Sequence, residues 1–265
     1  MAFWGDRWLT SRNVLISDMT SIKKKILVVC EGGTDFVFLE GIINYIGNSS
    51  GRSFDIQMLS PQIDATTGHA ERQGWTKVKS WCILHGKKSP DELLALDKET
   101  RAVVSRRNWE GLLIMSGADL LLVHLDTDIA GEIDNNFDHT KEHRRDCCER
   151  NLNLWLGILS IEPNCKYVLP TYAIETWLLA TYDSSSAAMI FSATPEDYEL
   201  IDDFEDKLIA IGYASKLKAS RRRLVKKASR YKNNDMYLPR LLTHITNVQL
   251  RCKELLYFMS LIQSI

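Results

Sequence analysis

Two apolar runs that each end in acidic residues constrain this chain more than any other feature. Residues 26–30 precede Glu31, and residues 120–125 precede Asp126 and Asp128. Strands covered on both faces are apolar throughout instead of alternating, so both runs are predicted to be buried strands of a parallel sheet. Ligands of open parallel sheets bind beyond the carboxyl ends of the strands. We therefore expect Glu31, Asp126 and Asp128 to meet at one rim.

A glycine turn and a helix are predicted after the first run. Thr34 is a candidate N-cap residue. One face of a helix over residues 35–46 carries Phe36, Leu39, Ile42, Ile43 and Ile46. Gly32 and Gly33 permit a sharp turn and leave room beside Glu31 for a phosphate group. The turn residues Gly32, Gly33 and Asp35 are therefore the candidate cofactor-binding residues.

Strands and helices alternate through the first two thirds of the chain. The pattern predicts a strand over 53–59, a helix over 75–84, a helix starting at Ser89 and Pro90, a helix over 140–161, a strand over 165–169 and a short helix over 173–180. This order favours an α/β fold with a parallel sheet flanked by helices and right-handed crossovers. We expect an N-terminal arm over 1–21, a metal-binding domain over 22–183 and a helical, basic region over 184–265.

Metal binding would explain why carboxylates gather at one rim, because they repel each other unless a cation lies between them. Mg²⁺ takes hard oxygen ligands, and Mn²⁺ is the alternative. Asp126 and Asp128 point the same way if the second strand stays extended, so they could share one metal ion. Glu31 would act as a base or as a further ligand, and two ions could clamp the oxygens of a phosphodiester.

Glu175 is a lone carboxylate among apolar residues of the segment 173–180. A carboxylate buried there without a partner would be costly. Glu175 is therefore either a further site residue or a structural group that pairs with an arginine or caps the turn after Pro170. Two other candidates have structural interpretations. His124 is interpreted as a core histidine whose hydrogen bonds are satisfied, and Cys30 as a core residue.

Charge and cysteine usage restrict the class of protein. The 265 residues carry 33 Lys and Arg against 34 Asp and Glu, a balance that neither indicates nor excludes a nucleic-acid ligand. None of the six cysteines forms a C-x-x-C pair, and no apolar stretch approaches the roughly 20 residues of a membrane span. We expect a cytoplasmic protein that does not enter a membrane.

A dense basic run near the C-terminus contrasts with this balance. It begins at Lys216 and Lys218, and its candidate nucleic-acid-binding residues are Arg221, Arg222, Arg223, Lys226, Lys227, Arg230 and Lys232. Such a run is either a solvated helix face or a surface that contacts phosphates. Phosphate contacts would depend on salt and would not depend on base sequence.

Three segments together resemble Toprim nucleases of the OLD-like and RloB-like group from bacterial anti-phage defence systems. They are the strand with Glu-Gly-Gly-Thr-Asp at 31–35, the strand with Asp-Thr-Asp at 126–128, and the segment 170–179 with its Glu-x-Trp-Leu-Leu helix. The resemblance implies a Toprim-like fold over about 22–183 and Mg²⁺-dependent cleavage of DNA or RNA, including tRNA. It makes Glu31 a base or ligand, Asp126 and Asp128 metal ligands, and Glu175 a ligand or organiser.

The resemblance also implies partners. The sequence contains no G-x-x-x-x-G-K-[ST] motif, so an ATPase that controls the nuclease would be a separate subunit. A homodimer is a further assembly to consider. Two other functions remain open: a non-catalytic interaction subunit with a degenerate Toprim fold, and a phosphohydrolase or nucleotidyl transferase that acts on small phosphate substrates. A closed pocket would favour small substrates, and an open groove with a basic rim would favour a polymer.

Overall fold

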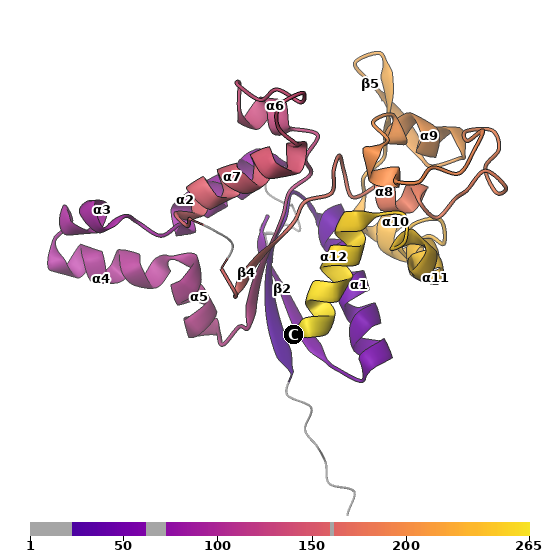
Figure 1. Ribbon diagram of the computed structural model, residues 1–265. Helices are drawn as coiled ribbons and strands as arrows, with labels where there is room; N and C mark the ends of the chain where they lie inside the picture. Colours follow the sequence, from indigo (N-terminus) through magenta and orange to yellow (C-terminus); the bar gives the residue numbers. More distant parts are fainter. Residues whose placement is uncertain (1–22, 62–72, 160–161) are drawn as a thin grey trace, which may run out of the picture.

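A four-stranded parallel sheet forms the centre of the molecule in the computed structural model, which describes residues 23–61, 73–159 and 162–265. The strands are β1 (Lys24–Val29), β2 (Phe54–Ser60), β3 (Leu120–His124) and β4 (Cys165–Val168), in the order β2-β1-β3-β4 (Figure 1). The predicted α/β fold with a parallel sheet is therefore confirmed. The predicted arm over 1–21 lies outside the described residues.

The connections between the strands place a switch in chain direction at the middle of the sheet. The chain passes through α1 (Gly33–Ser50) to the edge strand β2. It then returns through α2 (Trp75–His85), α3 (Pro90–Leu94), α4 (Lys98–Arg107) and α5 (Trp109–Ser116) to β3, on the other side of β1. The connection after β1 runs toward β2, whereas the connection after β3 runs toward β4 in the opposite direction, so the carboxyl ends of β1 and β3 form the position where such sheets bind ligands.

Side chains of β1 alternate between two hydrophobic cores, which explains why the strand is apolar throughout. Ile26 and Val28 pack in one core with α1 and the C-terminal helices. Leu27 and Val29 pack in the other core with α2, α5 and α7 (Arg144–Leu156). Figure 1 shows α1 and α12 on one side of the sheet and α2 and α7 on the other.

The C-terminal region packs against α1 and extends the core of that side of the sheet. It follows α8 (Thr176–Leu179) and contains the 3-10 helix η1 (Tyr198–Leu200), α9 (Phe204–Ala210), α10 (Ala228–Asn233), α11 (Leu238–Val248) and α12 (Lys253–Ser264). The prediction that this region is helical is wrong between Ser215 and Leu224. These residues form the antiparallel hairpin of β5 (Ser215–Lys218) and β6 (Arg221–Leu224).

Several predicted boundaries differ from the structure. Thr34 is not the N-cap of α1, because the helix already begins at Gly33 and the extended Gly32 precedes it. The helix predicted over 140–161 is limited to Arg144–Leu156 and ends at Gly157, whose φ of 64° is left-handed. The predicted start at Ser89 and Pro90 is confirmed by a capping box between Ser89 and Glu92. Across the described residues, every helix, including α6 (Ala130–Ile133), is too short or too polar to cross a lipid bilayer.

Candidate functional site

Glu31 and Asp126 meet at the switch point between β1 and β3, as the sequence predicts. The parallel register pairs Val29 with Val123, so both acidic residues follow their strands at nearly the same level. The backbone N–H of Asp126 donates a hydrogen bond of 2.9 Å to Oε1 of Glu31. This bond fixes the Glu31 carboxylate across the gap between the two strand ends.

A polar hollow of about 230 Å³ opens beside this contact. Its charged lining consists of Glu31, Asp35, Asp126 and Lys226, and Gly32 forms part of its wall. A Cβ atom added at Gly32 would lie 3.0 Å from Oε1 of Gln73, so this position has little space for a side chain. Two of the three predicted cofactor-binding residues, Gly32 and Asp35, line this hollow. Gly33 does not line the hollow, and a Cβ atom added there would lie 3.6 Å from the side chain of Ala228.

His124 belongs to the site and is not the satisfied core histidine that the sequence suggests. The ring is completely buried, and within the described part of the chain neither ring nitrogen has a hydrogen-bond partner. Its Nε2 lies 3.4 Å from Oδ1 of Asp126, which also accepts a hydrogen bond of 3.1 Å from the N–H of Ile174. Burial is the largest single effect and opposes a charge on His124, but the carboxylates of Asp126, Asp35 and Glu175 together outweigh it and raise the pKa of the imidazole.

Glu175 is completely buried at the start of α8, and its partners come from the C-terminal region. The Lys226 ammonium lies 2.9 Å from the carboxylate, and the hydroxyl of Tyr231 donates a hydrogen bond of 3.1 Å to Oε1. The pairing predicted with an arginine is therefore made by a lysine. Burial is the largest single effect and opposes the charge on Lys226, but Glu175, Asp126 and Asp35 together outweigh it and raise the pKa of the ammonium.

Lys226 was predicted to bind nucleic acid with the rest of the basic run, but its ammonium faces the acidic hollow. The residue as a whole is exposed, but its Nζ atom lies 2.9 Å from the Glu175 carboxylate, and Lys226 lines the hollow together with Asp126. One lysine therefore connects the end of β4, where Glu175 follows, with the ends of β1 and β3.

The carboxylates of the site outnumber the cations that face them. Burial, and then the charges of Asp126 and Asp35, raise the pKa of Glu31. Burial raises the pKa of Asp35 to about 6 against the lowering effect of His124. Desolvation by the surrounding protein, and then the charge of Asp126, raise the pKa of Asp128 to about 7. Because Asp128 is exposed, solvent screens the repulsion from Asp126. The site would be stabilised by an additional positive charge.

Asp126 and Asp128 do not align along one strand as expected. The strand β3 ends at His124, and the hydroxyl of Thr127 donates a hydrogen bond of 2.8 Å to the carbonyl of Pro170. Asp126 is buried and lines the acidic hollow, whereas Asp128 is exposed and is not among the residues that line it. Among the described residues, no three acidic, histidine or cysteine side chains converge closely enough to hold a metal ion. The oxygen donors suit Mg²⁺ or Mn²⁺ chemically, but binding would require their side chains to turn toward a common point.

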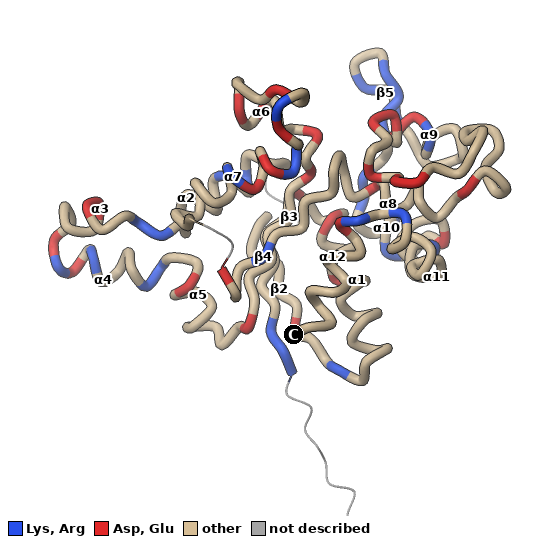
Figure 2. Tube along the Cα trace, in the orientation of Figure 1, with Lys and Arg blue, Asp and Glu red and all other residues tan. Residues whose placement is uncertain are grey.

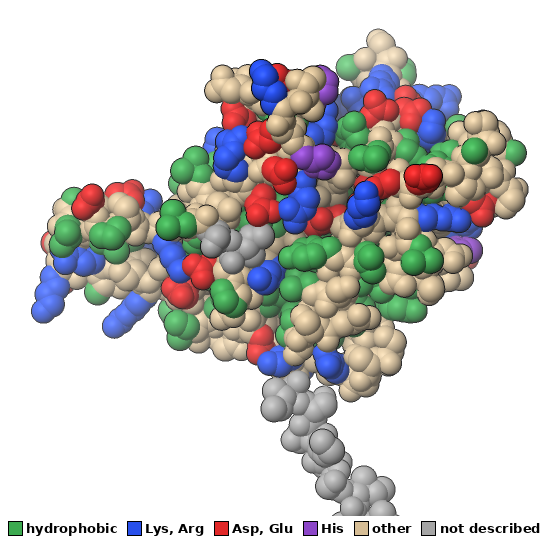
Figure 3. All heavy atoms as spheres, in the orientation of Figure 1, with side chains coloured by type: hydrophobic (Ala, Val, Ile, Leu, Met, Phe, Trp, Pro, Cys, Tyr) green, Lys and Arg blue, Asp and Glu red, His purple; other side chains and the backbone are tan. Residues whose placement is uncertain are grey.

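The remaining basic residues are divided between the two faces of a hairpin and neighbouring segments. On the β5–β6 hairpin, Lys216 pairs with Arg223 and Lys218 with Arg221, whereas Arg222 faces Leu217. Figure 2 shows that Lys and Arg positions of this hairpin lie beside acidic positions near α9, and Figure 3 shows basic side chains gathered in the same part of the surface. Lys227 and Arg230 lie beyond the hairpin, and Lys232 lies 3.9 Å from Glu40. The seven predicted nucleic-acid-binding residues therefore do not form one continuous surface.

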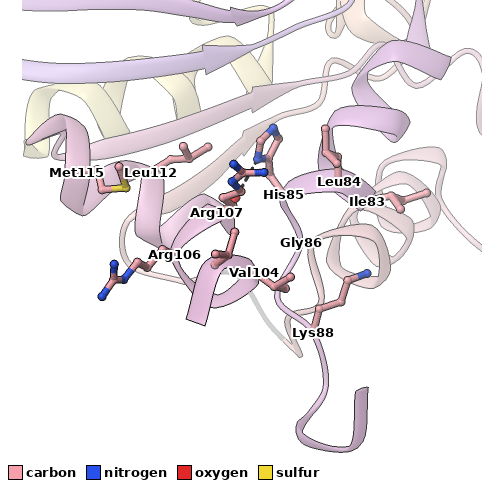
Figure 4. Close-up of a pocket in the computed structure, with 11 residues that line it drawn as sticks. Ile83, Leu84, His85, Gly86, Lys88, Val104, Arg106, Arg107, Leu112 and Met115 are labelled. Carbon is pink, nitrogen blue, oxygen red and sulfur yellow. Dashed lines mark hydrogen bonds between the residues drawn. The ribbon is translucent and has the colours of Figure 1, made fainter. Parts of the chain in front are cut away.

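A second hollow, of about 780 Å³, lies between α2, α4 and α5 and is shown in Figure 4. Its wall combines apolar side chains such as Leu84, Leu112 and Met115 with Arg106 and Arg107 at the rim. Among the described residues it shares no lining residue with the acidic hollow. This larger hollow is mainly apolar, and no carboxylate that could bind a metal ion lines it among the described residues.

Comparison of the chain with known protein families, with curated proteins and with solved structures gives no match. The assignment of function therefore depends on the geometry of the site. Sequence reasoning missed His124, Tyr231 and the role of Lys226 within it. A polar histidine at the end of an otherwise apolar strand was the signal that could have identified His124.

Proposed function

We propose that this protein is a metal-dependent nuclease with a Toprim-like fold that hydrolyses phosphodiester bonds in DNA or RNA. One observation supports this most strongly: Glu31 and Asp126 are joined at the switch point of a parallel sheet, beside a hollow with more carboxylates than cations. Sheets of this kind bind ligands there, and a phosphate with a divalent cation would satisfy both the space and the charge.

Asp126 and Asp128 would hold the cation, and Glu31 would act as a further ligand or as the general base. A bound Mg²⁺ or Mn²⁺ would neutralise the phosphate and stabilise the charge that develops during cleavage. Hydrolysis forms a bond from a water oxygen to phosphorus and breaks one P–O ester bond. Glu31 would take a proton from that water, because its raised pKa makes it a better base than an ordinary carboxylate. The leaving oxygen would take its proton from solvent.

Lys226 would place its positive charge against an oxygen of the same phosphate. Glu175 and Tyr231 act through this lysine, because their contacts of 2.9 and 3.1 Å fix the carboxylate that holds the ammonium at the hollow. Glu175 is therefore proposed as a positioning residue, and a direct role as a metal ligand is not required.

The proposed biological role is that of an anti-phage effector, as the resemblance of residues 31–35, 126–128 and 170–179 implies. The same resemblance implies control by an ATPase, which would be a separate subunit because the sequence contains no phosphate-binding loop of the Walker type. Both DNA and structured RNA such as tRNA are proposed substrates, and a homodimer is a proposed assembly.

One observation supports a second candidate function. A hollow of about 230 Å³ is small, which suits a phosphohydrolase or nucleotidyl transferase acting on a small phosphate compound. Lys226 lines this hollow and also the neighbouring hollow beside the basic hairpin, an arrangement that suits a polymer better.

A cleavage assay separates the two candidates. The purified protein is incubated with plasmid, single-stranded DNA, total tRNA or p-nitrophenyl phosphate, in the presence of Mg²⁺, Mn²⁺ or EDTA. The nuclease proposal predicts cleavage of at least one polymer, which EDTA abolishes. Release of p-nitrophenol without any polymer cleavage would instead favour the small-substrate enzyme.

A further inference from the structure

We propose that one face of the β5–β6 hairpin is a phosphate-binding track that guides a polynucleotide into the acidic hollow, with Lys226 as the residue shared by both. This inference rests on the proposed function, because it concerns the substrate of the same site. It differs from the sequence prediction, which treated Arg221, Arg222 and Arg223 as equivalent contacts.

The register of the hairpin selects four basic residues and excludes a fifth. Residues two apart on a strand point to the same face, and directly paired residues share that face. Lys216, Lys218, Arg221 and Arg223 therefore project from one side, and Arg222 projects from the other side with Leu217. The four cations line a hollow of about 550 Å³ together with Glu205 and Lys226.

This arrangement is unfavourable for the hairpin itself. Like charges directly opposite each other in an antiparallel pair are destabilising, and here both Lys216–Arg223 and Lys218–Arg221 are of this kind. The connecting residues Ala219 and Ser220 have φ values of 46° and 66°, a left-handed conformation that two-residue turns usually assign to Asn and Gly. Local stability therefore does not explain why four cations stand on one face.

Neighbouring acids neutralise only half of these charges. Asp206 lies 2.9 Å from Arg221, and Glu205 lies 2.7 Å from Arg223. Among the described residues, Lys216 and Lys218 have no acidic partner within ion-pair distance, and both are exposed. Two lysines thus remain available to a polyanion, while the two arginines are held in place beside them.

The track is continuous with the proposed catalytic site. Lys226 lines both the hairpin hollow and the acidic hollow, where it stands beside Glu31, Asp35 and Asp126. The hairpin is anchored at this end, because the N–H of Leu224 donates a hydrogen bond of 2.8 Å to Glu205 and the Leu224 side chain is buried. A chain of phosphates bound along the hairpin would therefore pass Lys226 before reaching the carboxylates.

Matched charge reversals test this assignment. Lys216→Glu, Lys218→Glu and Arg222→Glu each change the charge by the same amount on the same exposed hairpin. Their affinity for a fluorescein-labelled single-stranded oligonucleotide and for labelled total tRNA is measured by fluorescence anisotropy in EDTA, over a series of salt concentrations. EDTA separates binding from cleavage.

Lys216→Glu and Lys218→Glu are each expected to weaken binding roughly tenfold near 0.1 M salt and to reduce the slope of log K against log salt by about one, as expected for one lost phosphate contact. Arg222→Glu should bind like the wild type. The two lysine variants should also melt at the wild-type temperature or above, because each new glutamate faces an arginine across the hairpin. Loss of binding without loss of stability excludes unfolding as the cause.

Three results would overturn the inference. Equal weakening in all three variants would mean that the run acts as a diffuse positive charge. Wild-type affinity in both lysine variants would exclude this face, and a wild-type protein that binds neither oligonucleotide nor tRNA would exclude the track altogether. Binding that follows the prediction in a protein that cleaves no substrate with Mg²⁺ or Mn²⁺ would support the track and refute the nuclease proposal.

Discussion

The buried carboxylate of Glu199 makes the stability of this protein depend on pH in a direction that can be calculated. Its Oε1 accepts a hydrogen bond of 2.7 Å from Nε1 of Trp177, and its Oε2 accepts one of 3.0 Å from the N–H of Glu254. The side chain is 2% exposed and has no cation beside it in the described structure. Burial raises the pKa of Glu199 to about 7, against a usual value of 4.5.

A raised pKa in the folded state means that the folded protein holds its proton more tightly than the unfolded chain. This contribution to stability is complete below pH 4.5 and is lost as the pH rises through about 7. Each pKa unit corresponds to about 1.4 kcal/mol, so Glu199 should cost the protein about 2.5 kcal/mol between pH 5 and pH 8. The loss should appear as a lower urea midpoint.

Urea denaturation of the wild type and of Glu199→Gln at pH 5, 6, 7 and 8 tests this value. Glutamine carries no titrating group, so the difference in unfolding free energy between the two proteins isolates Glu199. Glu254 titrates in both proteins and cancels. The variant should lose part of the hydrogen bonding and be less stable at pH 5, yet the gap should narrow or reverse by pH 8. A gap that stays constant within about 0.5 kcal/mol would refute the burial argument.

Two further predictions concern the site. In a double-mutant cycle of Glu175→Gln and Lys226→Met, the unfolding free energies should show a coupling of about 1 to 3 kcal/mol, because the two side chains form an ion pair at 2.9 Å. Additive effects of the two substitutions would show that this ion pair contributes nothing to stability. Gly32→Ala should change the melting temperature little, because alanine can adopt the φ of −160° found at this position. The added methyl group should narrow the hollow and raise the KM for the substrate. An unchanged KM would mean that the substrate binds elsewhere.

The sheet and its acidic rim could be predicted because they depend on local patterns. A strand buried on both faces is apolar throughout, and the position of Glu31 and Asp126 then follows from the rule for parallel sheets. The break after His124 was not predictable in this way, because it depends on the contacts of Thr127 with the segment after β4. The local sequence after His124 does not distinguish a strand that continues from a chain that bends.

The C-terminal partners of the site could not be predicted, because the contacts join distant parts of the chain. Lys226 is 51 residues from Glu175, and no local pattern distinguishes it from the other basic residues of the run. The hairpin was missed for a different reason. Lys and Arg favour helices, and the turn uses Ala219 and Ser220 instead of the Asn-Gly or Asp-Gly pair that marks a two-residue hairpin.

A titration with Mn²⁺ tests the central claim most directly, because it measures the metal site without needing the correct substrate. Isothermal titration calorimetry is carried out on the wild type, on Glu31→Gln and on Glu196→Gln, a control at an exposed carboxylate outside the site. The account predicts saturable binding by the wild type and the control, and at least a tenfold loss of affinity in Glu31→Gln. Equal binding by all three proteins, or no binding by the wild type, would contradict the claim that the strand-end carboxylates form a metal-dependent catalytic site.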